Sequence, residues 1–450
     1  MQEGGCVKTI VRELEPAAVS TRTKQAGEAQ DPWAWVERAV WTDRMLEALE
    51  KGVKGGVWFS LIDKVHRPKV LFAAWLSVRG KGRAVGSDRQ SLEQFEEGLE
   101  TNLAKLEEEL RTGTYRPRPI RRVYIDKPGS KAKRPLGIPT VRDKVVQTAL
   151  KMVIEPIFEH EFMDTSFGFR PGVGCKDALR SVERLLKAGY SWVVDADLKS
   201  YFETIGHERL MKEVQQRIAD SRVLDLIRGF LKQQILEDLQ LWTPETGSPQ
   251  GAVISPLLSN LYLHEVDKAM KMAGYKMVRY ADDFVILCKS QTEAEAALAQ
   301  VTELVGDRGL TLHADKTSLV NTTQPGQGFD FLGYHFENGT RWPRKKSLNK
   351  FKDTIRGKTR RSNCRSMAAI IEDVNKTSQG WFEYFKHSHW TTFKPLDGWI
   401  RRRFRTILRG YCKGKGISRG KDNIRWPNKY FQDLGYFSLY DAHRSLLQSS

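Results

Sequence analysis

The sequence has little cysteine and no long apolar segment. Its 450 residues contain five cysteines, which lie far apart and form no Cys-x-x-Cys pair. This spacing excludes a disulfide framework and a zinc knuckle, so we expect no disulfide partner. No run approaches the 18 apolar residues that a membrane helix needs, and the N-terminus lacks the pattern of a signal peptide. These absences predict a soluble, cytoplasmic protein with no membrane partner.

Acidic residues are scarce in the C-terminal quarter of the chain. From Arg341 to Ser450 there are 26 basic and 8 acidic residues, whereas residues 1–340 hold 47 of each. This region therefore carries the whole net charge of +18. A second concentration, from Arg111 to Lys144, has 11 basic and 2 acidic residues. Two basic regions around a balanced middle predict a polyanion held from both sides, and two solvated basic faces are the alternative.

The pattern along the chain predicts an α+β protein of several parts. At roughly 150 residues per domain, the length suggests about three units. Helical spacing, hairpin signals and alternating strand and helix signals follow one another along the sequence. The expected parts are a loose leader (1–30), a helical N-terminal extension (31–113), a region with a basic hairpin (114–190), an antiparallel sheet backed by helices (191–340), a basic helical domain (341–411) and a short basic extension (412–450).

Hydrophobic periodicity also predicts individual elements of these parts. Apolar runs that end in polar residues indicate strands, and a spacing of three to four residues indicates helices. Three helices are expected after Lys345. The other main predictions are strands at Trp192–Asp197, Lys276–Tyr280, Phe284–Cys288 and Phe329–Phe336, and a helix at Leu210–Leu231.

Three carboxylates stand at strand ends in the predicted central sheet. Asp282 and Asp283 occupy a tight turn between two strands, and Asp197 ends a third strand. Such like charges are costly together unless a cation binds, and few protein oxygens suit Mg²⁺, which takes further ligands from water and phosphate. Two such ions about 3.5–4 Å apart support in-line displacement at phosphorus, which is the chemistry of nucleotidyl transfer. For the Asp-Asp pair alone, an exposed turn is the alternative.

The segment Tyr280-Ala281-Asp282-Asp283 resembles the active-site hairpin of reverse transcriptases. The resemblance extends to the family's first palm motif, its nucleotide-positioning loop, its lysine-bearing motif and its primer grip. It implies a right-hand polymerase with fingers, palm and thumb, in which Asp197, Asp282 and Asp283 bind two Mg²⁺ ions, with Mn²⁺ as a substitute. The matching segments are Asp195–Phe202, Ser248–Pro256, Gly309–Thr317 and Phe331–Gly333.

More specifically, the chain is similar to bacterial group II intron-encoded reverse transcriptases and maturases that lack an endonuclease domain. The likeness implies an RNA-directed DNA polymerase that binds its structured intron RNA and assists splicing and target-primed reverse transcription. Its implied partners are an RNA template with a DNA primer, dNTPs and target DNA, in the bacterial cytoplasm and at the nucleoid during mobility. The segments that carry it are Arg116–Thr140, Ser166–Gly172, Gly380–Phe385 and Gly398–Arg402.

Two alternatives remain open at this point. The first is a reverse transcriptase of a retron, CRISPR-associated or antiphage system, which the segment Gly398-Trp399-Ile400 disfavours. The second is an RNA-binding splicing cofactor whose polymerase activity is incidental. Three clustered carboxylates disfavour this second alternative, because without a metal they would repel phosphate.

The resemblance also assigns residues to the nucleotide and to RNA. Arginine can bind phosphate oxygens in pairs and lysine acts as a point charge, while contact with the template backbone is the alternative for both. A phenylalanine ring beside the sugar would exclude a 2′-hydroxyl, and its alternative is a place in the core. The expected nucleotide-binding residues are Lys127, Arg134, Phe202, Gln250, Gly251 and Lys316. The expected RNA-binding residues are Arg121, Arg122, Lys131, Lys133, Arg401, Arg402, Arg403 and Arg405.

Overall fold

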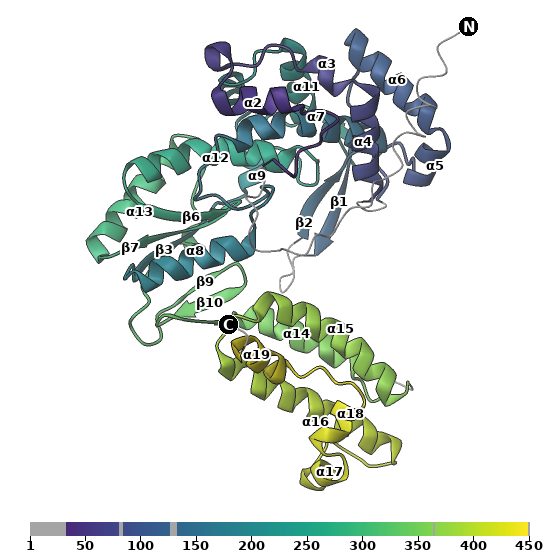
Figure 1. The fold of residues 1–450 in the computed structure, drawn as a ribbon, viewed down its shortest axis with the longest axis vertical. Helices are drawn as coiled ribbons and strands as arrows, with labels where there is room; N and C mark the ends of the chain where they lie inside the picture. The colour runs from purple at the N-terminus through teal and green to yellow at the C-terminus, as the bar shows by residue number, and fades with distance from the viewer. Residues whose placement is uncertain (1–32, 81–83, 127–132, 363–364, 449–450) are drawn as a thin grey trace. The chain divides into compact units, whose positions relative to one another are not determined.

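The structure is a computed structural model that describes residues 33–80, 84–126, 133–362 and 365–448. The expected leader, Lys127 and Lys131 lie outside the described residues. The chain forms two compact units that interleave along the sequence (Figure 1). Of the described residues, those within 1–182, 196–287 and 292–318 form the first unit, and those within 183–195, 288–291 and 319–450 form the second. Within the described residues, no helix has both the length and the apolar character needed to cross a membrane.

The first unit is built around the buried helix α7 (Val141–Glu159). The Thr140 hydroxyl caps this helix by accepting a hydrogen bond from the Asp143 amide at 3.3 Å. Helices α3, α4, α6 and α12 pack against it. The helices of this unit other than α7 are α2 (Asp43–Lys51), α3 (Ile62–Val65), α4 (Pro68–Arg79), α5 (Leu92–Glu97), α6 (Leu99–Thr112), α9 (Tyr201–Thr204), α10 (His207–Gln215), α11 (Ser221–Leu231), α12 (Ser255–Met272) and most of α13 (Gln291–Gly306). Helix α8 (Cys175–Lys187) begins in this unit and ends in the second.

The predicted basic hairpin is confirmed as strands β1 (Ile120–Asp126) and β2 (Lys133–Ile138). The two strands pair antiparallel, with Ile125 opposite Arg134. Short strands β4 (Ile235–Glu237) and β5 (Gln240–Trp242) extend the sheet to the order β2-β1-β4-β5. The basic side chains of the hairpin therefore project from a four-stranded sheet.

A second four-stranded sheet has the order β6-β7-β3-β8. Its strands are β3 (Trp192–Asp197), β6 (Lys276–Tyr280), β7 (Asp283–Cys288) and β8 (Ser318–Asn321). The predictions for β3 and β6 match their observed bounds, and β7 begins one residue earlier than expected. Strands β6 and β7 pair antiparallel. The mixed helices and sheets confirm the α+β class.

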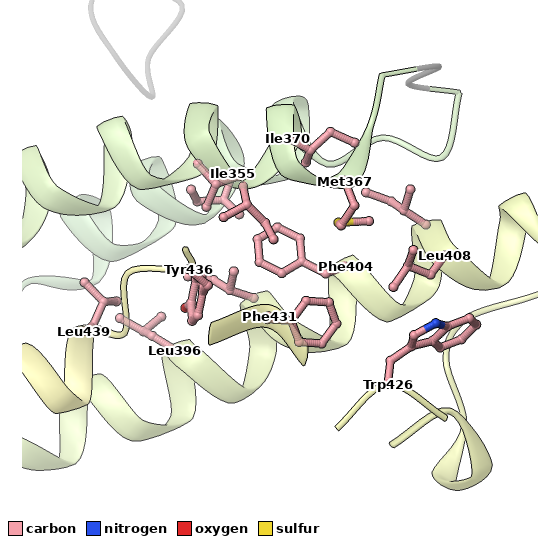
Figure 2. Close-up of a cluster of buried hydrophobic side chains, with 14 of the residues drawn as sticks. Ile355, Met367, Ile370, Leu396, Phe404, Leu408, Trp426, Phe431, Tyr436 and Leu439 are labelled. Carbon is pink, nitrogen blue, oxygen red and sulfur yellow. The ribbon is translucent and has the colours of Figure 1, made fainter. Parts of the chain in front are cut away.

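The second unit contains a helical domain with its own hydrophobic core (Figure 2). Phe404 and Ile355 lie in the middle of this core and are fully buried. Asp397 is buried on α16, where it accepts hydrogen bonds from the Tyr436 hydroxyl at 2.6 Å and the Tyr440 amide at 2.9 Å. The helices of this domain are α14 (Lys345–Lys358), α15 (Met367–Phe385), α16 (Phe393–Tyr411), α17 (Gly420–Arg425), α18 (Asn428–Asp433) and α19 (Leu439–Gln448). This unit also has a three-stranded sheet of β9 (Phe329–Phe331), β10 (Tyr334–Glu337) and β11 (Thr340–Pro343).

Two predicted elements are broken in the structure. The helix expected at Leu210–Leu231 is interrupted because the Asp220 carboxylate caps a new helix, α11, by accepting from the Arg222 and Val223 amides. The strand expected at Phe329–Phe336 turns back on itself between β9 and β10. Leu332 and Gly333 both have positive φ there, at 47° and 85°.

The prediction of three helices after Lys345 was also too few, because the described residues there form six α-helices. The three additional helices are short, and the stretch after residue 411 has little helical periodicity to reveal them. Phe431 and Leu439 from this stretch are fully buried in the core of the domain. Residues of the predicted C-terminal extension therefore contribute to the core of the helical domain.

Candidate active site

The carboxylate pair lies at the turn between β6 and β7 in the first unit. Tyr280 and Asp283 form the last pair of the hairpin, which leaves Ala281 and Asp282 as the two turn residues. Ala281 has a φ of 60° and is buried. A positive φ is common in tight hairpin turns, although it is unusual for an alanine. The turn places Asp282 at the end of the sheet.

The backbone around Asp197 places Lys316 next to the Asp197 carboxylate. Beyond the end of β3, Leu198 forms an antiparallel bridge with Leu312. The His313 amide donates to the Asp197 carbonyl at 2.8 Å. Lys316, on the short helical turn that follows, forms an ion pair with the Asp197 carboxylate. The predicted lysine of the site therefore contacts a predicted metal ligand.

The charges of these residues act on one another. Burial raises the pKa of Asp282, and the negative charge of Asp197 raises it further. The cations Arg134 and Lys316 oppose that increase. The negative charges of Asp197 and Asp282 therefore oppose each other, and together they favour a positively charged group.

These donors fit a hard divalent cation that is shared with a substrate. Among the described residues there is no cluster of three or more His, Cys, Asp or Glu side chains able to hold a metal ion. The negative charge of Asp197 acts on Asp282, and these two residues and Asp283 do not form such a cluster. Two neighbouring carboxylates nevertheless suit Mg²⁺, since this ion is usually held by one or two carboxylates together with water and phosphate oxygens.

The β1–β2 hairpin, which we call the finger hairpin, is hydrogen-bonded to the predicted nucleotide-positioning loop, Ser248–Pro256, in the same unit. Arg134 on β2 donates from Nε to the Gln250 side-chain oxygen at 2.6 Å, and the Gly137 amide donates to the Gln250 carbonyl at 2.6 Å. Gly251 has a φ of 108°, and a Cβ there would overlap the Gly137 carbonyl oxygen. The backbone at Gly251 therefore lies directly against strand β2.

Phe202 lies at the wall of a cavity next to this loop. It is 6% exposed and makes an edge contact with Phe169 at a centroid distance of 6.5 Å. The cavity has a volume of about 440 Å³, and its lining includes Phe202, Gln250 and Gly137. Phe202 is thus largely packed, with one side toward an open space of nucleotide size.

The basic residues of the finger hairpin have different surroundings. Arg121 donates to the Val85 carbonyl at 3.0 Å, and Arg122 forms an ion pair with Glu237 at 3.2 Å. The Arg122 guanidinium also lies 4.9 Å from the ring centre of Trp242. Lys133 is exposed near the described end of the hairpin. Lys133 is therefore the more accessible to RNA, while both arginines already have protein partners.

The arginines of α16 also divide into two groups. Arg403 donates to the Thr359 carbonyl at 3.1 Å, and buried Arg405 donates to the Trp426 carbonyl at 2.9 Å. Arg401 and Arg402 line a hollow of about 650 Å³ together with Arg419, and Arg405 reaches its wall. We call this feature the arginine hollow. It gathers positive charge on the second unit.

Sequence reasoning passed over a group of charged and polar side chains beneath the carboxylate turn. Arg279, Asp267 and Asn260 are each about 1% exposed, and they bond to one another. One signal was present, because Arg279 stands in a strand of buried apolar residues. Asp267 and Asn260 stand seven residues apart on α12, which places them on one helix face. Without the fold, nothing connected that face to the turn.

The sheet β6-β7-β3-β8, which carries Asp197 and Asp282, the finger hairpin with Arg134 and the basic helical domain are the parts expected of a right-hand polymerase fold. The family model described as reverse transcriptase (RNA-dependent DNA polymerase) matches residues 125–336. The group II intron, maturase-specific domain matches residues 348–426. The chain belongs to the group II intron-encoded reverse transcriptases.

Relatives from several organisms support this membership. The group II intron-encoded protein LtrA of Lactococcus lactis is 39% identical over 214 residues, which cover 47% of this chain and 35% of that protein. Protein YkfC of Escherichia coli is 36% identical over 302 residues, covering 58% of this chain and 78% of that protein. The putative COX1/OXI3 intron 1 protein of Saccharomyces cerevisiae is 28% identical, covering 75% and 47%. The match thus spans about a third of LtrA and most of YkfC.

Proposed function

We propose that this chain is an RNA-directed DNA polymerase that also binds group II intron RNA. The observation that carries the polymerase activity is the ion pair of Lys316 with Asp197, whose negative charge, together with burial, raises the pKa of Asp282 at the turn. A site that combines repelling carboxylates with cations is suited to a metal-bound triphosphate. Its substrates are an RNA template, a DNA primer and dNTPs.

Each residue of the site has a role that follows from its surroundings. Asp197 and Asp282 would hold Mg²⁺, or Mn²⁺ in its place, which would neutralise charge on the triphosphate, and Asp283 is proposed as a further ligand from the sequence resemblance alone. Arg134 extends from β2 and is exposed, so its guanidinium can bind phosphate oxygens while Gln250 orients it. Lys316 holds the Asp197 carboxylate until substrate arrives and then faces the phosphates. Phe202 limits the space beside the sugar.

The second part of the proposal is splicing and mobility. The maturase-specific match and the arginine hollow lie in the same helical domain, which supports intron RNA as the polyanion bound there. Guanidinium groups pair with phosphates at two points, so a hollow lined by Arg401, Arg402 and Arg419 suits an RNA backbone. With target DNA as a further partner, the chain would act in the cytoplasm and at the nucleoid.

The test of the polymerase activity is primer extension by Asp197→Asn and Asp282→Asn variants on poly(rA)–oligo(dT). Each change removes a charge from the metal site and leaves the shape of the side chain. We expect a loss of at least about 100-fold, the scale at which removal of one group that stabilises a transition state acts. RNA affinity should stay the same.

Asp225→Asn is the matched control, because Asp225 is exposed on α11 and is paired with Arg228. It should extend primers at the normal rate. Extension by Asp282→Asn at the rate of this control would contradict the proposed active site.

A further inference from the structure

A buried ion pair lies directly beneath the carboxylate turn. Arg279 is on β6, two residues before Ala281, and its side chain is 1% exposed, while that of Asp267 is 0% exposed. Removing two charges from water costs several kcal/mol per ion, which the attraction between them often fails to recover. Replacing such a pair with apolar residues is often neutral for stability. Its presence at this place therefore calls for a reason other than folding.

The guanidinium of Arg279 connects three parts of the first unit. Its Nε donates to the Asp267 Oδ1 at 2.7 Å, and its Nη2 donates to Oδ2 of the same carboxylate. Its Nη1 donates to the Asn260 side-chain oxygen at 3.1 Å and to the Ala281 carbonyl at 2.9 Å. Helix α12, which carries Asp267 and Asn260, is thereby bonded to the turn that presents Asp282.

The segment before α8 holds the same turn from another side. The Asn260 side-chain amide donates to the Gly168 carbonyl at 2.6 Å. The Phe167 amide donates to the Arg279 carbonyl at 2.9 Å. A Cβ at Gly168 would overlap the Ala281 nitrogen, so the two backbones are in direct contact. One network of side chains therefore joins the turn, the helix and the Gly168 segment.

The turn needs such support because its conformation is unfavourable by itself. A non-glycine residue with a φ near 60° is strained, and such residues persist only where their surroundings hold them. Ala281 is held at its carbonyl by Arg279 and at its nitrogen by contact with Gly168. Asp282 is the next residue, so any relaxation of Ala281 moves its carboxylate.

We propose that Arg279 is a positioning residue of the polymerase, and that Asp267 and Asn260 aim its guanidinium at the Ala281 carbonyl so that Asp282 stays in register with Asp197. The inference rests on the proposed function, because it assumes that Asp282 acts in catalysis. Whatever the role of Asp282, the buried ion pair serves the geometry of the turn more than the stability of the fold.

The test is a double replacement, Arg279→Met with Asp267→Leu, which removes both buried charges together. The variant leaves no unpaired ion, so it should fold and bind a template–primer duplex as the unchanged protein does. The bond to the Ala281 carbonyl is removed. A misplacement of about 1 Å at a reacting centre costs on the order of 100-fold in rate. We expect kcat to fall by about that factor, with the KM for dTTP within about threefold.

The matched control is Arg308→Met with Glu213→Leu in the same unit. This pair is also largely buried, with side chains 13% and 9% exposed, and Arg308 donates to the Tyr262 carbonyl at 2.9 Å rather than to the carboxylate turn. It should keep kcat within about threefold. Equal kcat values in the two double variants would overturn the inference, as would a parallel loss of duplex affinity in the Arg279 variant.

Two further variants make the outcome decisive. Arg279→Lys keeps the charge opposite Asp267 but lacks the planar fork that reaches Asn260 and Ala281, so kcat should fall while the melting temperature changes little. If the double variant fails to fold, a normal kcat in Arg279→Lys overturns the inference. Asp282→Asn is measured beside them. If it is active, the proposed function fails; if it is inactive while the Arg279 variants are active, only the positioning role fails.

Discussion

The carboxylate turn and helix α16 differ in how the fold balances their charged side chains. At the turn, Asp282 is brought toward Asp197, and burial raises its pKa, so the two carboxylates together favour an added cation. On α16, Arg403 and Arg405 direct their donors to backbone carbonyls of their own domain, while Arg401 and Arg402 line the arginine hollow. A charged residue is informative about function when the fold leaves its charge to be balanced by something else.

The largest effect that would sharpen this comparison is expected at Gly168. A methyl group there overlaps the Ala281 nitrogen, so Gly168→Ala must displace the carboxylate turn. We expect kcat for primer extension to fall by about 100-fold, as for other displacements near 1 Å, with RNA affinity unchanged. Single-turnover extension with saturating dTTP measures this.

Gly174→Ala is the control, because a Cβ at Gly174 meets no atom within 4 Å. This variant should extend primers normally. Equal rates for the two alanine variants would show that the turn tolerates displacement.

The next effect concerns the sugar. Phe202→Val shortens the side chain at the wall of the cavity, so a ribonucleotide should be accepted more readily. We expect the preference for dTTP over UTP to fall roughly 10-fold, within the range that apolar pocket contacts provide. The ratio of kcat/KM for the two nucleotides is the measurement. An unchanged ratio would mean that Phe202 packs in the core and does not select the sugar.

The elements that carry the candidate site were easier to predict from the sequence than the finer fold. Strand ends, the turn and the finger hairpin have local signals, so the elements that carry Asp197, Asp282 and Arg134 could be predicted, while the roles of these residues stay predictions. The breaks at Asp220 and Leu332 depend on a cap and on positive φ values, which periodicity does not register. The network of Arg279 depends on a helix packing beneath a strand, and that packing has no local signal.

The arginines of α16 show the same limit on what the sequence alone can predict. The sequence predicted a basic helical domain at 341–411, and Arg401 to Arg405 lie within it on α16. The sequence could not show that Arg405 would be buried, because its partners, Trp426 and Asn428, lie more than twenty residues away in sequence. The basic helix was predictable, and the division between arginines bonded within the domain and arginines that line the arginine hollow was not.

A moderate effect is expected when Arg401 and Arg402 are both changed to Gln. If both bind phosphates, the slope of log affinity for intron RNA against log salt concentration should flatten, by roughly 0.7–0.9 for each phosphate that is no longer neutralised. Filter binding measures this slope over a range of about 50 to 300 mM KCl, which includes physiological ionic strength.

Arg405→Gln is the contrasting variant in that experiment. Since Arg405 bonds to the Trp426 carbonyl and to Asn428, its removal should lower the melting temperature and leave the slope unchanged. A flatter slope for Arg405→Gln and an unchanged one for the Arg401 and Arg402 variant would reverse the assignment.

The smallest effect concerns pH. Burial lowers the pKa of His264 on α12, so the folded protein takes up a proton there less readily than the unfolded chain does. The free energy of unfolding should therefore fall as the pH drops below the ordinary histidine value near 6.5. Compared with His264→Gln, the unchanged protein should lose more stability between pH 7.5 and about pH 5.5. Parallel acid dependence in urea unfolding would contradict this.

The most direct measurement of the central claim is the binding of Mn²⁺, followed by electron paramagnetic resonance, in the presence of dTTP and a template–primer whose 3′ end is blocked. The unchanged protein and Asp225→Asn should bind the ion alike, while Asp197→Asn and Asp282→Asn should each lose most of it. Equal binding by all four proteins would contradict the claim that these two carboxylates jointly hold the catalytic cation.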